Sequence, residues 1–285
     1  MINEKHTVRT IQEMRDRGER ITMLTAYDYP VAKQINDAEI DMILVGDSAA
    51  MVVHGYPNTL NATMDMMVLH CAAVARACTR TMVIADMPFG SFQYGIDETM
   101  RNAARFVTEA RVDGVKFEAT PNHIEKTRAI VQMGIAVMGH VGLHPQAVGA
   151  LGGLKAQGRT IDTARKVMTE ALALQEAGAF AIIFEAVPAK LATYVTRKLR
   201  VPTISIGGGP GCSGQLLVTY DVLGMFDTFT PKFAKKYANL NKVMAETFAT
   251  YRDEVRAGKF PDEQHIYGVS DEIMLEMEEE FGKAD

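Results

Sequence analysis

Short, nearly continuous runs of apolar residues recur along the chain and alternate with longer amphipathic stretches. Seven runs have the length of buried strands, namely Ile21–Thr25, Met42–Gly46, Thr81–Ala85, Gly114–Glu118, Ile135–Gly139, Ala181–Glu185 and Thr203–Ile206. An eighth strand is expected after Gly214, near Leu216–Asp221 or a little later. Strands without polar alternation are typical of parallel sheets that helices cover on both faces.

Helical patterns occupy the intervals between these runs. Apolar residues recur at helical spacing over Asp97–Ala110 and over Thr163–Ala177, and Gly178 follows where the second helix would end. About seven strand–helix repeats within roughly 250 residues favour a closed barrel over an open, doubly wound sheet. We therefore predict an α/β fold, a (β/α)8 TIM barrel. We expect a single domain over residues 1–285, with an acidic helical extension from about residue 262.

Composition places the protein among ordinary globular proteins. The 285 residues are 47% hydrophobic and 23% charged, and a net charge of −5 gives no electrostatic support for nucleic-acid binding. Three cysteines form no C-x-x-C pair, and no apolar run approaches the roughly 18 residues of a membrane span. The first ten residues lack an apolar signal core. We expect a cytoplasmic protein that binds neither nucleic acid nor membranes.

Polar side chains stand at the carboxyl ends of five predicted strands. In chain order they are Asp47 and Ser48, Asp86, Lys116 and Glu118, His140, and Glu185. The carboxyl ends of barrel strands surround one cavity, which holds the active site in enzymes of this fold. Lys116 and Glu118 are two residues apart, so both face the barrel interior, while Val115 and Phe117 pack outward.

Each of these residues alone has a common structural explanation. An Asp after a strand often caps a turn or a helix, and Glu185 could pair with a barrel lysine or arginine. Together, four carboxylates and one lysine at strand ends need a further explanation, because a buried charge without a partner costs several kcal/mol. Such groups require one another or a cation, so we interpret them as one shared site.

Hard oxygen ligands come from three of the predicted strands, in Asp47, Asp86 and Glu118. Mg²⁺ suits such a set, with water and substrate oxygens completing its octahedron. His140 and His144 have a spacing seen in zinc sites, but they lie on a strand and a loop rather than on a helix. We therefore expect His140 to hydrogen-bond within the pocket and His144 to be a loop residue.

Lys116 and Glu185 are the candidates for the chemistry itself. Lys116 could neutralise a substrate carboxylate, or it could form a Schiff base as in aldolases. Glu185 lies on a strand well separated from the proposed metal ligands. A carboxylate with a raised pKa in a pocket can accept a proton, and this is the role we expect for Glu185.

Two glycine-containing segments are candidates for ligand contact or loop closure. The run over residues 206–214 follows the seventh strand and could either contact a bound phosphate or form a tight barrel turn. It lacks the Walker spacing and a dinucleotide fingerprint. Residues 152–159 form a second polar, glycine-containing segment, which we interpret as a lid.

Nine short segments in a fixed order give the sequence a specific resemblance. They are Thr25-Ala-Tyr-Asp-Tyr29, Leu44-Val-Gly-Asp-Ser48, Ala85-Asp-Met-Pro-Phe-Gly-Ser91, Val115-Lys-Phe-Glu118, Gly139-His-Val-Gly-Leu143, Pro145-Gln146, Gln157-Gly-Arg159, Glu185-Ala-Val-Pro188 and Pro231-Lys-Phe-Ala234. Over roughly residues 20–260 the sequence resembles the ketopantoate hydroxymethyltransferases, also called 3-methyl-2-oxobutanoate hydroxymethyltransferases.

The resemblance implies a barrel of the phosphoenolpyruvate mutase and isocitrate lyase group. It implies Mg²⁺-dependent transfer of a hydroxymethyl group from 5,10-methylenetetrahydrofolate to 3-methyl-2-oxobutanoate through a stabilised enolate. The product would be 2-dehydropantoate, for pantothenate biosynthesis. The resemblance also implies a homo-oligomer, specifically a decameric ring.

The resemblance also implies roles for individual residues. By position, Asp47 and Asp86 look like the metal ligands, joined by Glu118 directly or through water. The residues that look like contacts to the 2-oxoacid are Asp47, Ser48, Asp86 and Lys116. Glu185 looks like the proton acceptor, and His140 looks like the pocket histidine.

Several positions depart from the family pattern. Ala49-Ala50 replaces Leu-Gly, Ala119-Thr120 replaces two glycines, and His144 replaces a threonine. Ser213 replaces an aspartate, and Tyr220 replaces a histidine. We expect these changes beside the oxoacid pocket and in the folate-side loops. They therefore bear on which oxoacid and which one-carbon donor the protein uses.

Two other classes of function are considered. A divergent paralogue, or a C–C lyase or mutase of the same barrel group, would act on another 2-oxoacid. Such lyases commonly use a cysteine in a lid loop, and residues 152–159 contain none. A non-catalytic barrel scaffold is the other class, but a binding protein has no need to bear the cost of a buried charged cluster.

Overall fold

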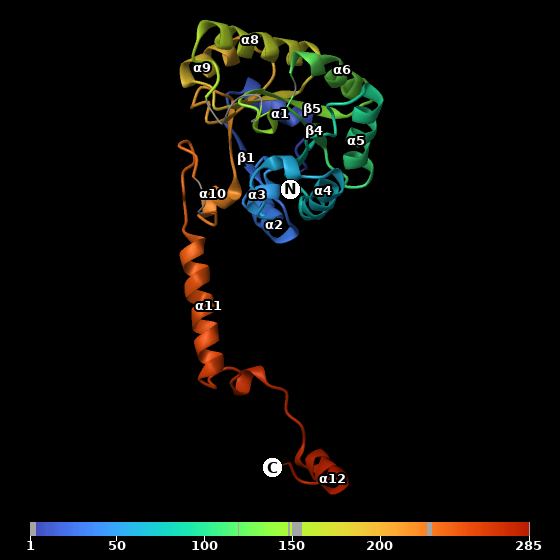
Figure 1. Ribbon diagram of the computed structural model, residues 1–285, viewed down its shortest axis with the longest axis vertical. Helices are drawn as coiled ribbons and strands as arrows, with labels where there is room; N and C mark the ends of the chain where they lie inside the picture. Colours follow the sequence, from blue (N-terminus) through green and yellow to red (C-terminus); the bar gives the residue numbers. More distant parts are fainter. Residues whose placement is uncertain (1–3, 119, 148, 150–155, 227–229, 285) are drawn as a thin grey trace. The chain divides into compact units, whose positions relative to one another are not determined.

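The structure is a computed structural model that describes residues 4–118, 120–147, 149, 156–226 and 230–284 (Figure 1). Eight parallel strands close into a barrel in chain order, which confirms the predicted TIM-barrel fold. The strands are β1 Ile21–Thr25, β2 Met42–Val45, β3 Met82–Asp86, β4 Gly114–Lys116, β5 Ala136–Gly142, β6 Ala181–Glu185, β7 Thr203–Ile206 and β8 Gly214–Leu217.

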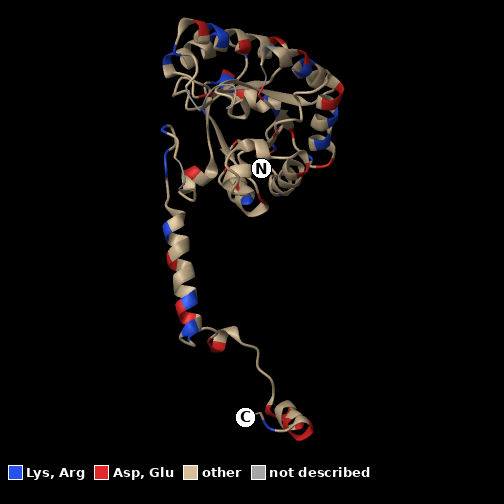
Figure 2. Cartoon of the chain, in the orientation of Figure 1, with Lys and Arg blue, Asp and Glu red and all other residues tan. Residues whose placement is uncertain are grey.

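Helices follow most strands and surround the barrel. In the described part of the first 237 residues, the α-helices are α1 Val8–Asp16, α2 Tyr29–Asp37, α3 Ala49–Val52, α4 Met64–Ala77, α5 Ile96–Thr108, α6 Ile124–Gln132, α8 Ile161–Glu176, α9 Ala189–Lys198 and α10 Thr219–Leu223. Some helix starts carry polar caps, such as Asp28 before α2, whose carboxylate accepts a hydrogen bond from the Val31 amide at 2.8 Å. Figure 2 shows acidic and basic residues interspersed along the outer helices.

Three strand boundaries differ from the prediction in ways that affect the site. β4 ends at Lys116, so Glu118 lies just beyond the strand, whereas β5 continues to Gly142 and contains His140. The eighth strand was expected after Gly214, near Leu216–Asp221 or a little later; it is present but lies slightly earlier, because β8 spans Gly214–Leu217. A Cβ at Gly214 would overlap the carbonyl of Ile21, so the close packing of β8 on β1 requires a glycine here. The prediction had placed the strand after this glycine.

Side-chain parity along each strand separates two apolar layers. One layer fills the barrel interior and includes Met23, Met42, Met82, Met138 and Ile183. The other lies between the sheet and the helices and includes Val83, Val115, Val137 and Phe184. Because alternate residues of a strand face the same side, the interior positions lead upward to the polar residues at the carboxyl rim.

The glycine-rich run after β7 is packed against a helix. Cβ atoms at Gly209 and Gly211 would overlap Ala189 and Thr193 of α9. The chain therefore passes from β7 to β8 without an intervening helix, and the glycines allow it to run close under α9. Of the two interpretations of this run, the packing supports a tight barrel turn.

All three cysteines are buried and unpaired in disulfides. Cys71 lies in α4 and Cys78 follows that helix, while Cys212 lies between β7 and β8. Burial raises the pKa of all three thiols, well above the usual value for Cys71 and to about 11 for Cys78. These thiols therefore stay protonated and inaccessible in the folded barrel.

The chain divides into two compact units, residues 1–237 and residues 238–285. The second unit contains α11 Leu240–Arg256 and α12 Asp271–Phe281. The α12 sequence is rich in glutamate, as expected for the acidic tail, whereas α11 was not predicted. Among the described residues, no helix has the length and hydropathy required to cross a bilayer.

Candidate active site

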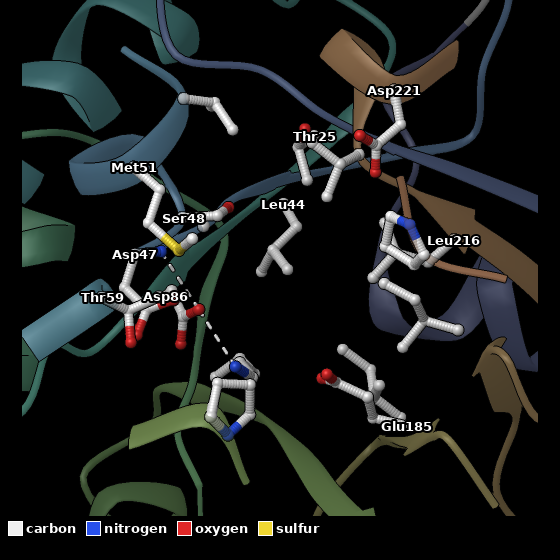
Figure 3. Close-up of a pocket in the computed structure, with 18 of the residues that line it drawn as sticks. Thr25, Leu44, Asp47, Ser48, Met51, Thr59, Asp86, Glu185, Leu216 and Asp221 are labelled. Atoms are coloured by element: carbon white, nitrogen blue, oxygen red, sulfur yellow. Dashed lines mark hydrogen bonds and ion pairs between the residues drawn. The ribbon is translucent and has the colours of Figure 1, made fainter. Parts of the chain in front are cut away.

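One pocket at the carboxyl rim of the barrel brings together every residue that the sequence analysis assigned to the site (Figure 3). They are Asp47, Ser48, Asp86, Lys116, Glu118, His140 and Glu185. Strand parity explains the convergence. Met82 and Ile84 face the interior and Asp86 continues that row, and Ile183 leads to Glu185 in the same way.

Asp86 and Lys116 form a buried ion pair across β3 and β4. Lys116 Nζ donates to Asp86 Oδ2 at 3.0 Å, and the backbone amide of Asp47 donates to the same oxygen at 3.2 Å. The second oxygen, Asp86 Oδ1, is buried and has no hydrogen-bond partner. Burial raises the pKa of Asp86 to about 7, although Lys116 opposes this shift. Asp86 therefore has one oxygen free for a further ligand.

Among the described residues that line the pocket, Lys116 is the one cation, and three carboxylates raise its pKa. Burial alone would lower its pKa, but the charges of Asp86, Asp47 and Glu118 raise the pKa above its usual value. A Schiff base requires a neutral amine as nucleophile. The surroundings therefore favour a permanently charged Lys116 that binds anions, and they count against the aldolase-type alternative.

Gln146 connects two of the proposed metal ligands. Its side-chain Nε2 donates to Asp47 Oδ2 at 2.9 Å and to the carbonyl of Met87 at 3.0 Å. Its backbone amide donates to Glu118 Oε2 at 3.1 Å. Burial raises the pKa of Asp47 and of Glu118, so these donors matter most when the two carboxyls are ionised.

Glu185 and His140 lie side by side on β6 and β5. His140 Nε2 is 3.2 Å from Glu185 Oε2, but neither ring nitrogen of His140 has a partner with hydrogen-bond geometry. Burial holds the pKa of His140 well below its usual value and raises the pKa of Glu185 to about 7. A neutral imidazole beside a carboxyl that titrates near neutrality suits proton transfer.

Ser48 closes the β2 side of the pocket. Its hydroxyl lies 2.9 Å from the hydroxyl of Tyr27, a side chain that is only 1% exposed. Tyr27 in turn packs edge-on against Tyr220, with ring centroids 5.5 Å apart. The Ser48 hydroxyl is thus held at the pocket wall by a buried aromatic pair.

The pocket carries a donor set that fits a divalent cation only in part. Among the residues that the structure describes, no three His, Cys, Asp or Glu side chains form a complete metal site. Lys116 and Gln146 engage oxygens of Asp86, Asp47 and Glu118. The free Asp86 Oδ1 and the neighbouring Asp47 still suit Mg²⁺, which needs only one or two carboxylates besides water and substrate oxygens.

With this geometry established, comparison with known proteins decides the family. The family model for ketopantoate hydroxymethyltransferase matches residues 5–263. The chain belongs to the ketopantoate hydroxymethyltransferase family. It is therefore a transferase.

Relatives of the same family match nearly the whole chain. The 3-methyl-2-oxobutanoate hydroxymethyltransferase of Acetivibrio thermocellus is 48% identical, covering 97% of this chain and 98% of its own length. The enzyme of the same name from Moorella thermoacetica is 50% identical over 92% of this chain and 97% of its own length.

Solved structures support the fold. Phosphonopyruvate hydrolase in complex with oxalate and Mg²⁺ aligns with a TM-score of 0.59 at 14% identity, over 98% of this chain and 100% of that one. The 2,3-dimethylmalate lyase, a member of the PEP mutase/isocitrate lyase superfamily, aligns with a TM-score of 0.60 at 17% identity, over 97% of this chain and 95% of that one. At these identities the likeness shows the shared barrel.

The departures from the family pattern fall in different places. Ala49 and Ala50 are fully buried at the start of α3, directly after Ser48. His144 is buried, and its Nε2 lies 3.3 Å from the carbonyl of His140. Ser213 lines neither the pocket nor its rim. Its hydroxyl lies 3.2 Å from the Thr203 amide, at the amino end of β7.

The remaining departures lie near the rim or outside the described residues. Thr120 contacts His123 through its amide and hydroxyl, at 3.2 and 3.3 Å from His123 Nδ1. Ala119 lies outside the described residues. Of the proposed lid over residues 152–159, only residues 156–159 are described.

Three residues in or beside the pocket of this family member were given no role in the sequence analysis. Gln146 holds Asp47 and Glu118, Tyr27 contacts Ser48, and Asp221 lines the pocket from α10. Gln146 and Tyr27 both lie in segments that carry the family resemblance, which was the signal available. Asp221 was missed because it lies on the short helix after β8, where a polar residue is ordinary.

Proposed function

We propose that the chain transfers a hydroxymethyl group from 5,10-methylenetetrahydrofolate to 3-methyl-2-oxobutanoate and produces 2-dehydropantoate, a step of pantothenate biosynthesis. One observation carries the proposal. A buried lysine and three carboxylates face a Glu185–His140 pair in a single pocket of a ketopantoate hydroxymethyltransferase family member. This arrangement separates an anion- and cation-binding side from a proton-accepting side.

The first half of the reaction requires loss of the C3 proton of the oxoacid. Lys116 would bind the substrate carboxylate through its positive charge, and the Ser48 hydroxyl would donate a hydrogen bond to a substrate oxygen. Asp47 and Asp86 would hold Mg²⁺, with Glu118 acting directly or through water. When bound, Mg²⁺ supplies Lewis-acid polarisation of the 2-oxo group.

Glu185 would accept the C3 proton and leave an enolate on the substrate. Its raised pKa keeps the driving force for proton transfer matched to neutral pH. His140 lies close enough to Glu185 to take part in orienting its carboxylate. Water would add to the methylene carbon of the folate as the bonds from that carbon to N5 and N10 break, which releases tetrahydrofolate and leaves the one-carbon unit as an aldehyde. The enolate carbon would then bond to the aldehyde carbon, and the proton held by Glu185 would pass to the aldehyde oxygen to give the hydroxyl group.

Hydrogen–deuterium exchange at C3 tests this proposal without the second substrate. The oxoacid and Mg²⁺ are incubated in D₂O with the protein, and loss of the C3 proton signal is followed by NMR. We expect metal-dependent exchange that Glu185→Gln abolishes. Glu170→Gln is the matched control, because Glu170 is also a buried carboxylate but lies outside the pocket.

Two outcomes would contradict the proposal. Absence of exchange in the wild-type protein, with no product after folate is added, would make another 2-oxoacid the substrate. Exchange that persists in Glu185→Gln would remove Glu185 from the role of proton acceptor.

We further propose a cytoplasmic homo-oligomer, and specifically a decameric ring. Helix α11 supports assembly, since Met244, Phe248, Tyr251 and Val255 lie at the i, i+4, i+7 and i+11 positions of one helix face. All four side chains are exposed. Light scattering coupled to size-exclusion chromatography tests this proposal, and a monomer would contradict it.

A further inference from the structure

The pocket has two chemically different sides. The charged groups come from the strand ends of β2 to β4 and from β6, as described above. The side formed by β7, β8 and the segment after them is apolar, and its lining residues are Ile206, Leu216, Val218, Phe226 and Phe233. One carboxylate, Asp221 of α10, interrupts this apolar side.

Asp221 differs from the other carboxylates of the pocket. It is only 5% exposed, yet among the described residues its side chain has no hydrogen bond or ion pair. By contrast, Asp86 faces Lys116, Asp47 faces Gln146, and Glu185 faces His140. Burial raises the pKa of Asp221, and only the charge of the exposed Lys236 opposes this shift.

A buried carboxylate without donors indicates a missing partner. The Asp221 oxygens are not among the enclosed, unpaired polar atoms of the described residues, so they stay open to the cavity, where a ligand can donate to them. Asp221 does not cap α10 either, since that helix has no side-chain cap and spans only five residues. Figure 3 shows Asp221 on a different side of the cavity from Asp47 and Asp86, so the charged cluster does not supply the partner either.

We propose that Asp221 binds the adjacent N–H groups of the pterin ring of the one-carbon donor, namely the 2-amino group and N3–H. This inference rests on the proposed function. A carboxylate accepts two parallel N–H bonds from such an edge, as it does from a guanidinium group. The flat ring would contact Phe226 and Phe233, since aromatic surfaces stack favourably.

The order of the strands supports this placement. In a closed barrel of eight strands, β8 lies opposite β4, so Asp221 lies across the rim from Lys116. An oxoacid bound on Lys116 and the acids of β2 and β3 leaves the β7–β8 side of the pocket free. A donor anchored at Asp221 would then enter beside the substrate, opposite the charged cluster.

Equilibrium binding of tetrahydrofolate and of its 2-desamino analogue tests the proposal. The two ligands differ only in the amino group that Asp221 would bind. We expect the wild-type protein to bind the analogue about 10- to 100-fold more weakly, the effect typical of hydrogen bonds to a charged group. Asp221→Asn should weaken tetrahydrofolate binding by a similar factor and should no longer distinguish the two ligands. Asp97→Asn, which changes an exposed carboxylate of α5, should bind both as the wild type does.

The C3 exchange reaction separates this proposal from the proposed function. Because exchange needs no folate, Asp221→Asn should retain it while the KM for 5,10-methylenetetrahydrofolate rises. Equal binding of both ligands by the wild-type protein would overturn the role of Asp221, whatever the stability of the variant. Loss of exchange together with folate binding in a folded Asp221→Asn protein would also overturn it. Absence of exchange in the wild type would contradict the proposed function instead.

Discussion

His140 Nε2 lies 3.2 Å from Glu185 Oε2, and the two residues sit on neighbouring strands of the barrel. Burial acts on them in opposite senses, because it disfavours whichever form is charged. It keeps His140 neutral and raises the pKa of Glu185 to about 7. The pair therefore presents one group that changes its protonation near neutral pH beside one that does not.

The pKa of Glu185 predicts the pH dependence of C3 exchange. Only the ionised carboxylate can accept a proton, so the rate should rise with pH through about 7 and then level off. Glu185→Gln should lower the rate by about 10²- to 10⁴-fold, the usual contribution of a general base. Exchange rates are measured by NMR between about pH 5.5 and about pH 8.5, a range that spans this transition. A rate that is flat or falls with pH would contradict the assignment.

The pKa of Asp86 predicts how the stability of the metal-free protein varies with pH. The folded state holds this proton up to about pH 7, whereas the unfolded state releases it near its usual pKa of 3.8. Folding is therefore favoured at low pH by this group, and the free energy of unfolding should fall as pH rises from 3.8 to about 7. The contribution is on the order of 1–4 kcal/mol.

Urea unfolding of wild type and Asp86→Asn isolates this contribution, since the variant should show a smaller fall. Mg²⁺ must displace the same proton, so it should raise Tm more at about pH 8 than at about pH 6. Identical pH profiles for the two proteins, or a larger effect of Mg²⁺ at the lower pH, would count against this role of Asp86.

The contacts of Gln146 predict that this neutral side chain affects both the stability of the protein and its affinity for Mg²⁺. Gln146→Met removes the donor to Asp47 Oδ2 and to the Met87 carbonyl. We expect a loss of about 1–3 kcal/mol of stability. Groups that orient metal ligands typically contribute about 10- to 100-fold in affinity, so Mg²⁺ binding measured by calorimetry should weaken by that factor.

Gln132→Met is the matched control for Gln146, because Gln132 is an exposed residue at the end of α6. It should change neither stability nor Mg²⁺ binding. Unaltered Mg²⁺ affinity in Gln146→Met would show that Asp47 keeps its orientation without this contact.

The stability of the fold should depend strongly on the absence of a side chain at Gly142. It has φ of +100°, and a Cβ there would overlap the carbonyl of Glu185 and the side chain of Val187. Backbone strain and overpacking together should cost Gly142→Ala about 2–6 kcal/mol. Gly134 has φ of +87° but open space around it, so Gly134→Ala should cost only the strain, about 1–3 kcal/mol. Chemical unfolding of the two variants compares them directly, and equal losses would contradict the steric account.

Much of the barrel was accessible to sequence analysis because buried parallel strands are continuous apolar runs. The bounds of β1, β6 and β7 agree with the prediction. The start of β8 does not, because Gly214 is needed for close approach to Ile21, and glycine in a sequence is otherwise a sign of a turn. The structure thus explains an error that local pattern could not avoid.

The charged residues of the site were predictable for a related reason. Asp86 and Glu185 each end an apolar strand, where a charge has no place unless it serves a site. Gln146 and Asp221 lie on a short turn and a short helix, where polar residues are ordinary. Their positions depend on how distant strands close the barrel, which periodicity does not encode.

The buried cysteines can report on local opening of the barrel. A thiol reagent can reach Cys71, Cys78 or Cys212 only when the surrounding elements separate, since all three are enclosed and protonated when folded. Cys71 and Cys78 report on the early helix α4, and Cys212 on the last turn of the barrel. Labelling rates at these natural positions would therefore show whether α4 and the β7–β8 connection open together or separately.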